Sequence, residues 1–182
     1  MSIYISLLRG INVGGRKGIK MDRLRASFEA LGFEQVRTYI QSGNVIFKAG
    51  KVSAPALCKR IENKLLQEFG FPTSVVVRTA DELASAVKNN PFLKERGVDV
   101  ERLHVMFLSD IPASSALTKL AELTALPDRS HWAGTEIYLL LPNGTAKSSL
   151  MKSPLDRLLS VVTTTRNWRT VNTLLQMCQE SR

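Results

Sequence analysis

The order in which strand-like and helix-like patterns follow one another narrows the fold of this chain to very few choices. Over the first eighty residues, alternating apolar runs and helical spacings come in the order strand, helix, strand, strand, helix, strand. The six segments are, in turn, residues 3–8, 21–31, 36–40, 45–48, 54–69 and 73–78. This order predicts an α+β unit of the ferredoxin-like (split βαβ) type, with an antiparallel sheet.

The second half of the chain repeats most of this order. After a helical pattern at about 80–89, two strand-like runs form a hairpin signal behind a strand and a helix. These segments, with the two helical patterns that follow, are residues 102–108, 113–123, 129–133, 136–141, 150–160 and 168–180. We expect the C-terminal helix to replace the last strand of this repeat.

The sequence therefore predicts an internal duplication with two ferredoxin-like halves. We assign residues 1–79 to a basic half and residues 80–182 to a second half that carries extra C-terminal helices.

The charge of the chain is unevenly placed. The net charge is +9, and residues 1–80 hold 13 Lys and Arg against 5 Asp and Glu, whereas residues 81–182 hold 12 against 11. This asymmetry favours a polyanionic or phosphate-bearing partner for the first half. The alternative is a basic surface that serves solubility alone.

Composition and spacing set several negative expectations. A hydrophobic fraction of 44% with no membrane-length apolar run predicts a globular, cytoplasmic protein without a membrane partner. Cys58 and Cys178 fall in helical patterns and are typical of core residues in a reducing compartment. His104 and His131 lack partners at ligand spacing, so we expect no metal site. No cofactor is expected either. No carboxylate pair or Ser-His-Asp order indicates catalysis, which leaves enzymatic activity open.

Residues 9–20 form the most distinctive segment, RGINVGGRKGIK, with four glycines and four cations directly after the first strand. Glycines permit positive φ and close approach, and successive free backbone N–H groups form an anion-binding concavity. Gly10 and Gly15 have P-loop spacing, but Arg16 and Lys17 follow where the motif needs Lys and a hydroxyl residue. No Gly-x-Gly-x-x-Gly fingerprint is present. A basic surface turn is the alternative interpretation.

The predicted topology brings a second segment to this loop. The first two strands of a βαββαβ unit run in the same direction, so the loop after the first and the hairpin after the second share one end of the sheet. The combined candidates for binding an oxyanion are Arg9, Asn12, Gly14, Gly15, Arg16, Lys17, Gln41, Ser42 and Asn44. Alternatively, Asn12 and Asn44 cap turns, and Gln41 and Ser42 are ordinary hairpin residues.

A late segment, TTTRNWR at 163–169, adds two further candidates before the last helix. Arg166 and Asn167 precede a helix N-terminus, where anions bind readily. We expect one of them to approach the loop 9–16 and complete a pocket between the halves. Trp168 is expected to attach its helix to the core rather than to stack on a base.

Three motifs together, LLRGINVGG, YIQSGNV and TTRNWRTV, resemble a bacterial family of conserved proteins of unknown function, domain of unknown function 1697. The resemblance covers essentially the whole chain and implies a duplicated ferredoxin-like α/β protein of the cytoplasm. It implies no activity, substrate, cofactor or catalytic residue.

Our first functional hypothesis is a binder of a phosphate-bearing ligand, RNA or nucleotide. Its rivals are an enzyme acting on a small anionic metabolite in a cleft between the halves, and a non-catalytic dimerising module. Recognition on the sheet face, as in RRM domains, is disfavoured because Tyr4 and Phe47 are the only candidate stacking residues on the strands. The oligomeric state is left open.

Overall fold

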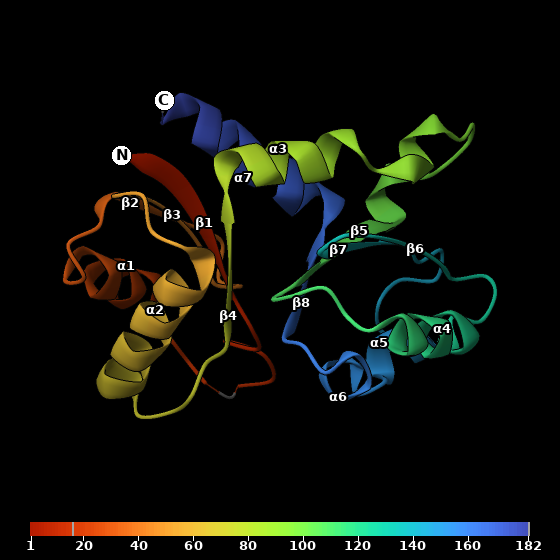
Figure 1. The fold of residues 1–182 in the computed structure, drawn as a ribbon, viewed down its shortest axis with the longest axis horizontal. Helices are drawn as coiled ribbons and strands as arrows, with labels where there is room; N and C mark the ends of the chain where they lie inside the picture. The colour runs from red at the N-terminus through yellow and green to blue at the C-terminus, as the bar shows by residue number, and fades with distance from the viewer. Residues whose placement is uncertain (16, 182) are drawn as a thin grey trace. The chain divides into compact units, whose positions relative to one another are not determined.

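Two four-stranded antiparallel sheets organise the protein, whose computed structural model describes residues 1–15 and 17–181 (Figure 1). Contacts divide the chain into two units, Met1–Ala84 with Thr173–Arg182, and Ser85–Asn172. Each unit holds one sheet with its own helices, which confirms the expected α+β fold with two ferredoxin-like halves. The boundary that we placed between residues 79 and 80 stays a prediction.

The sheet of the first unit has the strand order β2-β3-β1-β4. Its strands are β1 (Ser2–Leu8), β2 (Glu34–Tyr39), β3 (Asn44–Ala49) and β4 (Val75–Thr79). Helices α1 (Met21–Glu29) and α2 (Ala54–Phe69) lie together on one side of this sheet (Figure 1). Tyr4 and Phe47 pack in the resulting core and are almost fully buried, so neither ring is available to stack on a base.

The second unit repeats this arrangement with the order β6-β7-β5-β8. Its strands are β5 (Leu103–Leu108), β6 (Arg129–Ala133), β7 (Glu136–Leu140) and β8 (Thr163–Asn167). The elements α4 (Ser114–Leu123), α5 (Ser149–Lys152) and α6 (Leu155–Leu159) contribute to its core. Two 3-10 turns, η1 (Pro91–Lys94) and η2 (Val100–Arg102), precede β5.

Two expectations about the second half were wrong. Its final strand is present, because Thr163–Asn167 pairs antiparallel with β5 as β8. Three successive threonines, with high β propensity, explain why this edge segment is a strand. The single helix expected over 150–160 is two short helices, because Pro154 cannot donate a backbone hydrogen bond at their junction.

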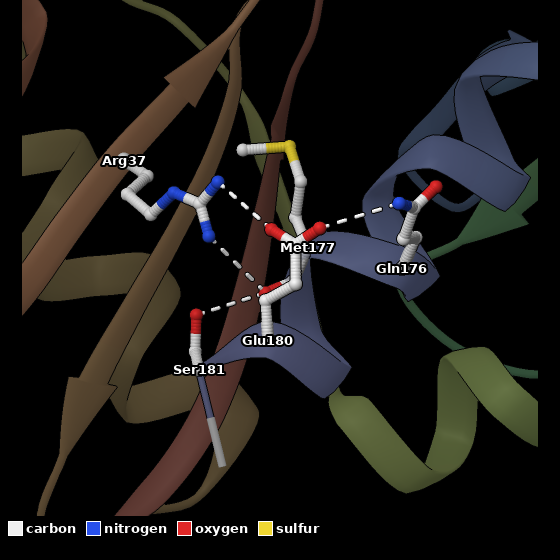
Figure 2. A network of polar contacts seen from close by, with 5 residues as sticks. All are labelled: Arg37, Gln176, Met177, Glu180 and Ser181. Carbon is white, nitrogen blue, oxygen red and sulfur yellow. Dashed lines mark hydrogen bonds and ion pairs between the residues drawn. The ribbon is translucent and has the colours of Figure 1, made fainter.

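The boundaries between the units fall within helices α3 (Ala80–Lys88) and α7 (Trp168–Glu180). Helix α3 follows β4, and α7 follows β8. The C-terminal part of α7 belongs to the first unit, where Arg37 of β2 donates to the Met177 carbonyl at 3.5 Å and pairs with Glu180 at 3.2 Å (Figure 2). Gln176 and Ser181 complete this polar network around the helix end.

Among the described residues, no helix is long and apolar enough to cross a membrane. Within the same part of the chain, no three His, Cys, Asp or Glu side chains gather in a way that could hold a metal ion.

Candidate functional site

The segment after β1, residues 9–20, is called the glycine loop below. Backbone hydrogen bonds on both sides fix the last residue of β1 and the first residue of the loop. Leu8 N–H donates to the Gly43 carbonyl at 2.8 Å, and Arg9 N–H donates to the Ser74 carbonyl at 2.9 Å. The glycine loop thus starts between the β2–β3 hairpin and the segment before β4. The predicted meeting of loop and hairpin is confirmed.

Close packing reinforces this junction. Ile11 of the glycine loop is buried against Gly43, where an added Cβ would lie 2.8 Å from Ile11 Cδ1 and 2.7 Å from Leu8 Cβ. Gly43 also has a φ of +76°, in the region that favours glycine. The hairpin can therefore pack this closely against Leu8 and Ile11 only because residue 43 is glycine and has no Cβ.

Asn12 acts inside the glycine loop. Its side-chain amide donates to the Ile19 carbonyl at 3.0 Å and to the Gln41 carbonyl at 2.8 Å, and its Oδ1 accepts from Ile19 N–H at 2.8 Å. Its φ of 54° is left-handed, a conformation that asparagine tolerates better than most residues. Asn12 thereby closes the loop and ties it to the hairpin, so its amide is occupied with holding the fold.

The hairpin candidates include one buried residue that holds the turn and others that are more exposed. Asn44 is fully buried, and its Nδ2 donates to the Tyr39 carbonyl at 3.0 Å and to Ser42 Oγ at 2.9 Å. Ser42 is half-buried, whereas Gln41 is exposed. Asn44 therefore shapes the turn, which favours the alternative interpretation that we gave for both asparagines.

The outer part of the glycine loop faces solvent. Gly14 and Gly15 are exposed with φ of 58° and 73°, and a Cβ on either would meet no atom within 4 Å. Lys17 is exposed, and its ammonium donates to the Pro72 carbonyl at 2.9 Å. Arg9 is half-buried, and Arg16 lies outside the described residues. Lys17 and Gln41 are thus the exposed candidate side chains that the structure describes at this end of the sheet, and Gly14 and Gly15 leave the loop backbone uncovered by side chains.

Two phenylalanines beside the glycine loop were not among the predicted site residues. Lys17 Nζ lies 5.8 Å from the centroid of the Phe71 ring, and Phe71 lies 6.3 Å from Phe69, centroid to centroid. The guanidinium carbon of Arg23 on α1 lies 5.0 Å from the centroid of Phe69. The Phe-Gly-Phe run that ends α2 is the sequence signal from which this row could have been found.

The cations of the row and the neighbouring Lys20 are only partly compensated, because Glu68, which is paired with Lys64, also interacts electrostatically with Arg23. Among the side chains that the structure describes, Lys17, Lys20 and Arg23 have no ion pair with a carboxylate, whereas Arg25 is paired with Asp22 and Glu29. The row therefore keeps an excess of positive charge next to the exposed glycines.

The remaining candidates belong to the second unit. Arg166 is only 8% exposed, and its Nη1 donates to Thr164 Oγ1 at 2.8 Å and to the Thr165 carbonyl at 2.9 Å. Burial lowers the pKa of Arg166 to about 10, so the guanidinium stays charged at neutral pH. Asn167 Oδ1 accepts from Thr170 N–H at 2.8 Å as the cap of α7. That either residue completes a pocket with the glycine loop stays a prediction.

The second unit has a pocket of its own around the start of α7. It measures about 520 Å³ and is lined by Val100, Glu101, Asn167, Trp168, Arg169 and Asn172. Arg169 and Glu101 form an exposed ion pair at 3.2 Å, and Asn172 donates to the Trp168 carbonyl at 2.8 Å. Trp168 itself is buried, as expected for a residue that attaches the helix to the core.

Fold and sequence together define the class of this protein. Residues 1–138 match the family model described as protein of unknown function (DUF1697), and the chain belongs to that family. A similar solved structure is that of the conserved bacterial protein SP0830 from Streptococcus pneumoniae. It is 25% identical, with a TM-score of 0.77 over 97% of this chain and 98% of the other. No curated protein matches the sequence.

Proposed function

We propose that the protein binds a phosphate-bearing ligand, RNA or nucleotide, at the outer part of the glycine loop. The observation that carries this proposal is the loop's construction. Asn12, Ile11 and Gly43 fix its base, while Gly14 and Gly15 are left bare at the surface, with the exposed Lys17 following them and Lys20 at the start of α1. Backbone N–H groups held in place next to cations are well suited to oxyanions, since little conformational freedom is lost on binding.

The charge distribution supports the same proposal. Most of the net charge of +9 comes from residues 1–80, the part of the chain that carries the glycine loop. Such a field raises the rate of encounter with anions and makes their binding sensitive to salt.

The test measures binding of ATP and of inorganic polyphosphate by calorimetry at low salt. We expect Lys17→Ala with Lys20→Ala to weaken binding of both probes by about tenfold or more, since each removes a charge-assisted contact. The matched control is Arg25→Ala, which removes a cation that is also exposed but is already paired with carboxylates. Equal affinities in the parent and the double variant would overturn the proposal.

A further inference from the structure

The row formed by Lys17, Phe71, Phe69 and Arg23 indicates which phosphate-bearing ligand the glycine loop takes. We infer that it is single-stranded nucleic acid, with bases stacked at the row and phosphates at Lys17 and the loop. This inference rests on the proposed function and adds the ligand's chemical class to it.

The rings and cations of the row hold one another in place. Phe69 and Phe71 are half-buried and pack against the core of the first unit. Each has its own cation near the ring, Arg23 at 5.0 Å and Lys17 at 5.8 Å from the centroids. Because the core packs against one side of each ring and a cation lies near the ring, the ring and its cation are held more firmly than an isolated surface side chain would be.

The fixed, exposed guanidinium of Arg23 is suited to stacking on a nucleic acid base. The guanidinium group is planar and weakly hydrated, and it stacks on aromatic rings and on nucleic acid bases. Arg23 is exposed, rests on Phe69, and is held by a donation to the Glu68 carbonyl at 3.4 Å. A base stacked on Arg23 would add a third layer to the stack that the guanidinium and the Phe69 ring already form.

The row contains two cation–ring units, Arg23 with Phe69 and Lys17 with Phe71. The two cation–ring units stand side by side, with 6.3 Å between the ring centroids. The Arg23–Phe69 unit offers a planar stacking surface, and the Lys17–Phe71 unit adds a positive charge beside it. A strand can therefore stack a base on Arg23 while its neighbouring phosphates contact Lys17 and the loop, whereas a mononucleotide reaches fewer of these groups. Paired bases in a duplex hide their faces and cannot stack in this way. No base edge is read by this surface, so we expect little sequence preference.

The experiment measures fluorescence anisotropy of labelled RNA and DNA strands of about 12 nucleotides, a length typical of single-strand sites. Competitors are ATP, inorganic polyphosphate and the matching duplex. We expect the single strands to bind at least about tenfold more tightly than ATP or the duplex, and Arg23→Lys to weaken them by about tenfold. Because Arg23→Lys keeps the charge, polyphosphate binding should change by less than about twofold.

The matched control is Arg25→Lys, an exposed arginine on the same helix for which the described part of the chain shows no ring contact, and it should leave all affinities unchanged. Thermal unfolding of both variants checks that they are folded. If polyphosphate binds but Arg23→Lys has no effect on the single strands, or the duplex binds equally well, the inference is wrong and the proposed function survives. If neither polyphosphate nor the strands bind, both fail.

Discussion

Gly43 is the residue at which the hairpin and the glycine loop come closest. A Cβ at this position would lie 2.7 Å from Leu8 Cβ, and the φ of +76° is unfavourable for alanine. We expect Gly43→Ala to lower the free energy of unfolding by roughly 2–5 kcal/mol, from backbone strain and overpacking together. Gly14→Ala, at φ +58° with open space around it, should cost only the backbone strain of about 1–2 kcal/mol. Equal losses in urea denaturation would contradict this account of the junction.

His104 of β5 links the stability of the fold to pH. Burial lowers its pKa below the ordinary value of 6.5, so the folded state favours the neutral ring. The associated stabilisation is present above pH 6.5 and is lost as the pH falls toward and through the folded-state pKa. We expect the difference in unfolding free energy between about pH 7.5 and pH 5 to be smaller in His104→Gln than in the parent. An identical pH dependence of the two proteins would show that another group is responsible.

The glycine loop depends as an element on the three hydrogen bonds of the Asn12 side chain. Asn12→Gly keeps the left-handed backbone accessible and removes these bonds, so it isolates their contribution. We expect a loss of about 1–3 kcal/mol and faster hydrogen exchange at the Ile19 amide, which loses its acceptor. Gln41→Ala is the control, because Asn12 bonds to the backbone of Gln41 and not to its side chain. Unchanged exchange at Ile19 in Asn12→Gly would refute the assignment.

The two ends of helix α7 should differ sharply in what a substitution costs. Trp168 at its start is buried, so Trp168→Ala should cost roughly 3–5 kcal/mol in unfolding free energy. Glu180 near its end pairs with Arg37 in a half-exposed contact (Figure 2), so Glu180→Gln should cost about 1 kcal/mol or less. Thermal or urea denaturation of the two variants measures both effects. A loss for Trp168→Ala no larger than that for Glu180→Gln would show that the tryptophan does not attach the helix.

Elements with strong periodicity were predictable, and those that depend on distant partners were not. Helix α2 occupies the segment expected from its four-residue apolar spacing, Ala54–Phe69. Strand β8 was missed because Thr163–Asn167 has no apolar residue and becomes a strand only by pairing with β5. The break between α5 and α6 follows from Pro154, a local signal that the helical spacing around it obscured.

The general position of the candidate site was predictable, but the orientation of its side chains was not. Strand direction alone brought the glycine loop and the hairpin to one end of the sheet. The inward orientation of Asn12 and Asn44 depends on tertiary hydrogen bonds, and the row with Phe69 and Phe71 depends on how α2 ends against the loop. The Phe-Gly-Phe run signals two rings at the end of α2, but the cations that cover them and the inward turn of the two asparagines cannot be derived from the sequence alone.

At the scale of the whole molecule, the two units repeat one pairing scheme. Ile5 of β1 pairs with Ile46 and Arg78, and Val105 of β5 pairs with Tyr138 and Arg166. Both sheets thus carry an arginine at the same place on their last strand, which supports the duplication inferred from the order of elements. The glycine-rich basic loop follows the first strand of the first unit alone, since Ser109, Asp110 and Ile111 follow β5. We therefore expect the proposed binding to belong to the first unit.

The most direct test is a titration of the ¹⁵N-labelled protein with a single-stranded RNA of about 12 nucleotides, followed by amide chemical shifts at low salt. We expect the largest changes at Gly14, Gly15, Lys17 and Lys20, and their loss in the Lys17→Ala, Lys20→Ala variant. Raising the salt should reverse them, since each phosphate contact to a single strand contributes a slope of about −0.7 in log affinity against log salt. Changes confined to residues of Ser85–Asn172, or no changes at all, would contradict the assignment of the glycine loop as the binding site.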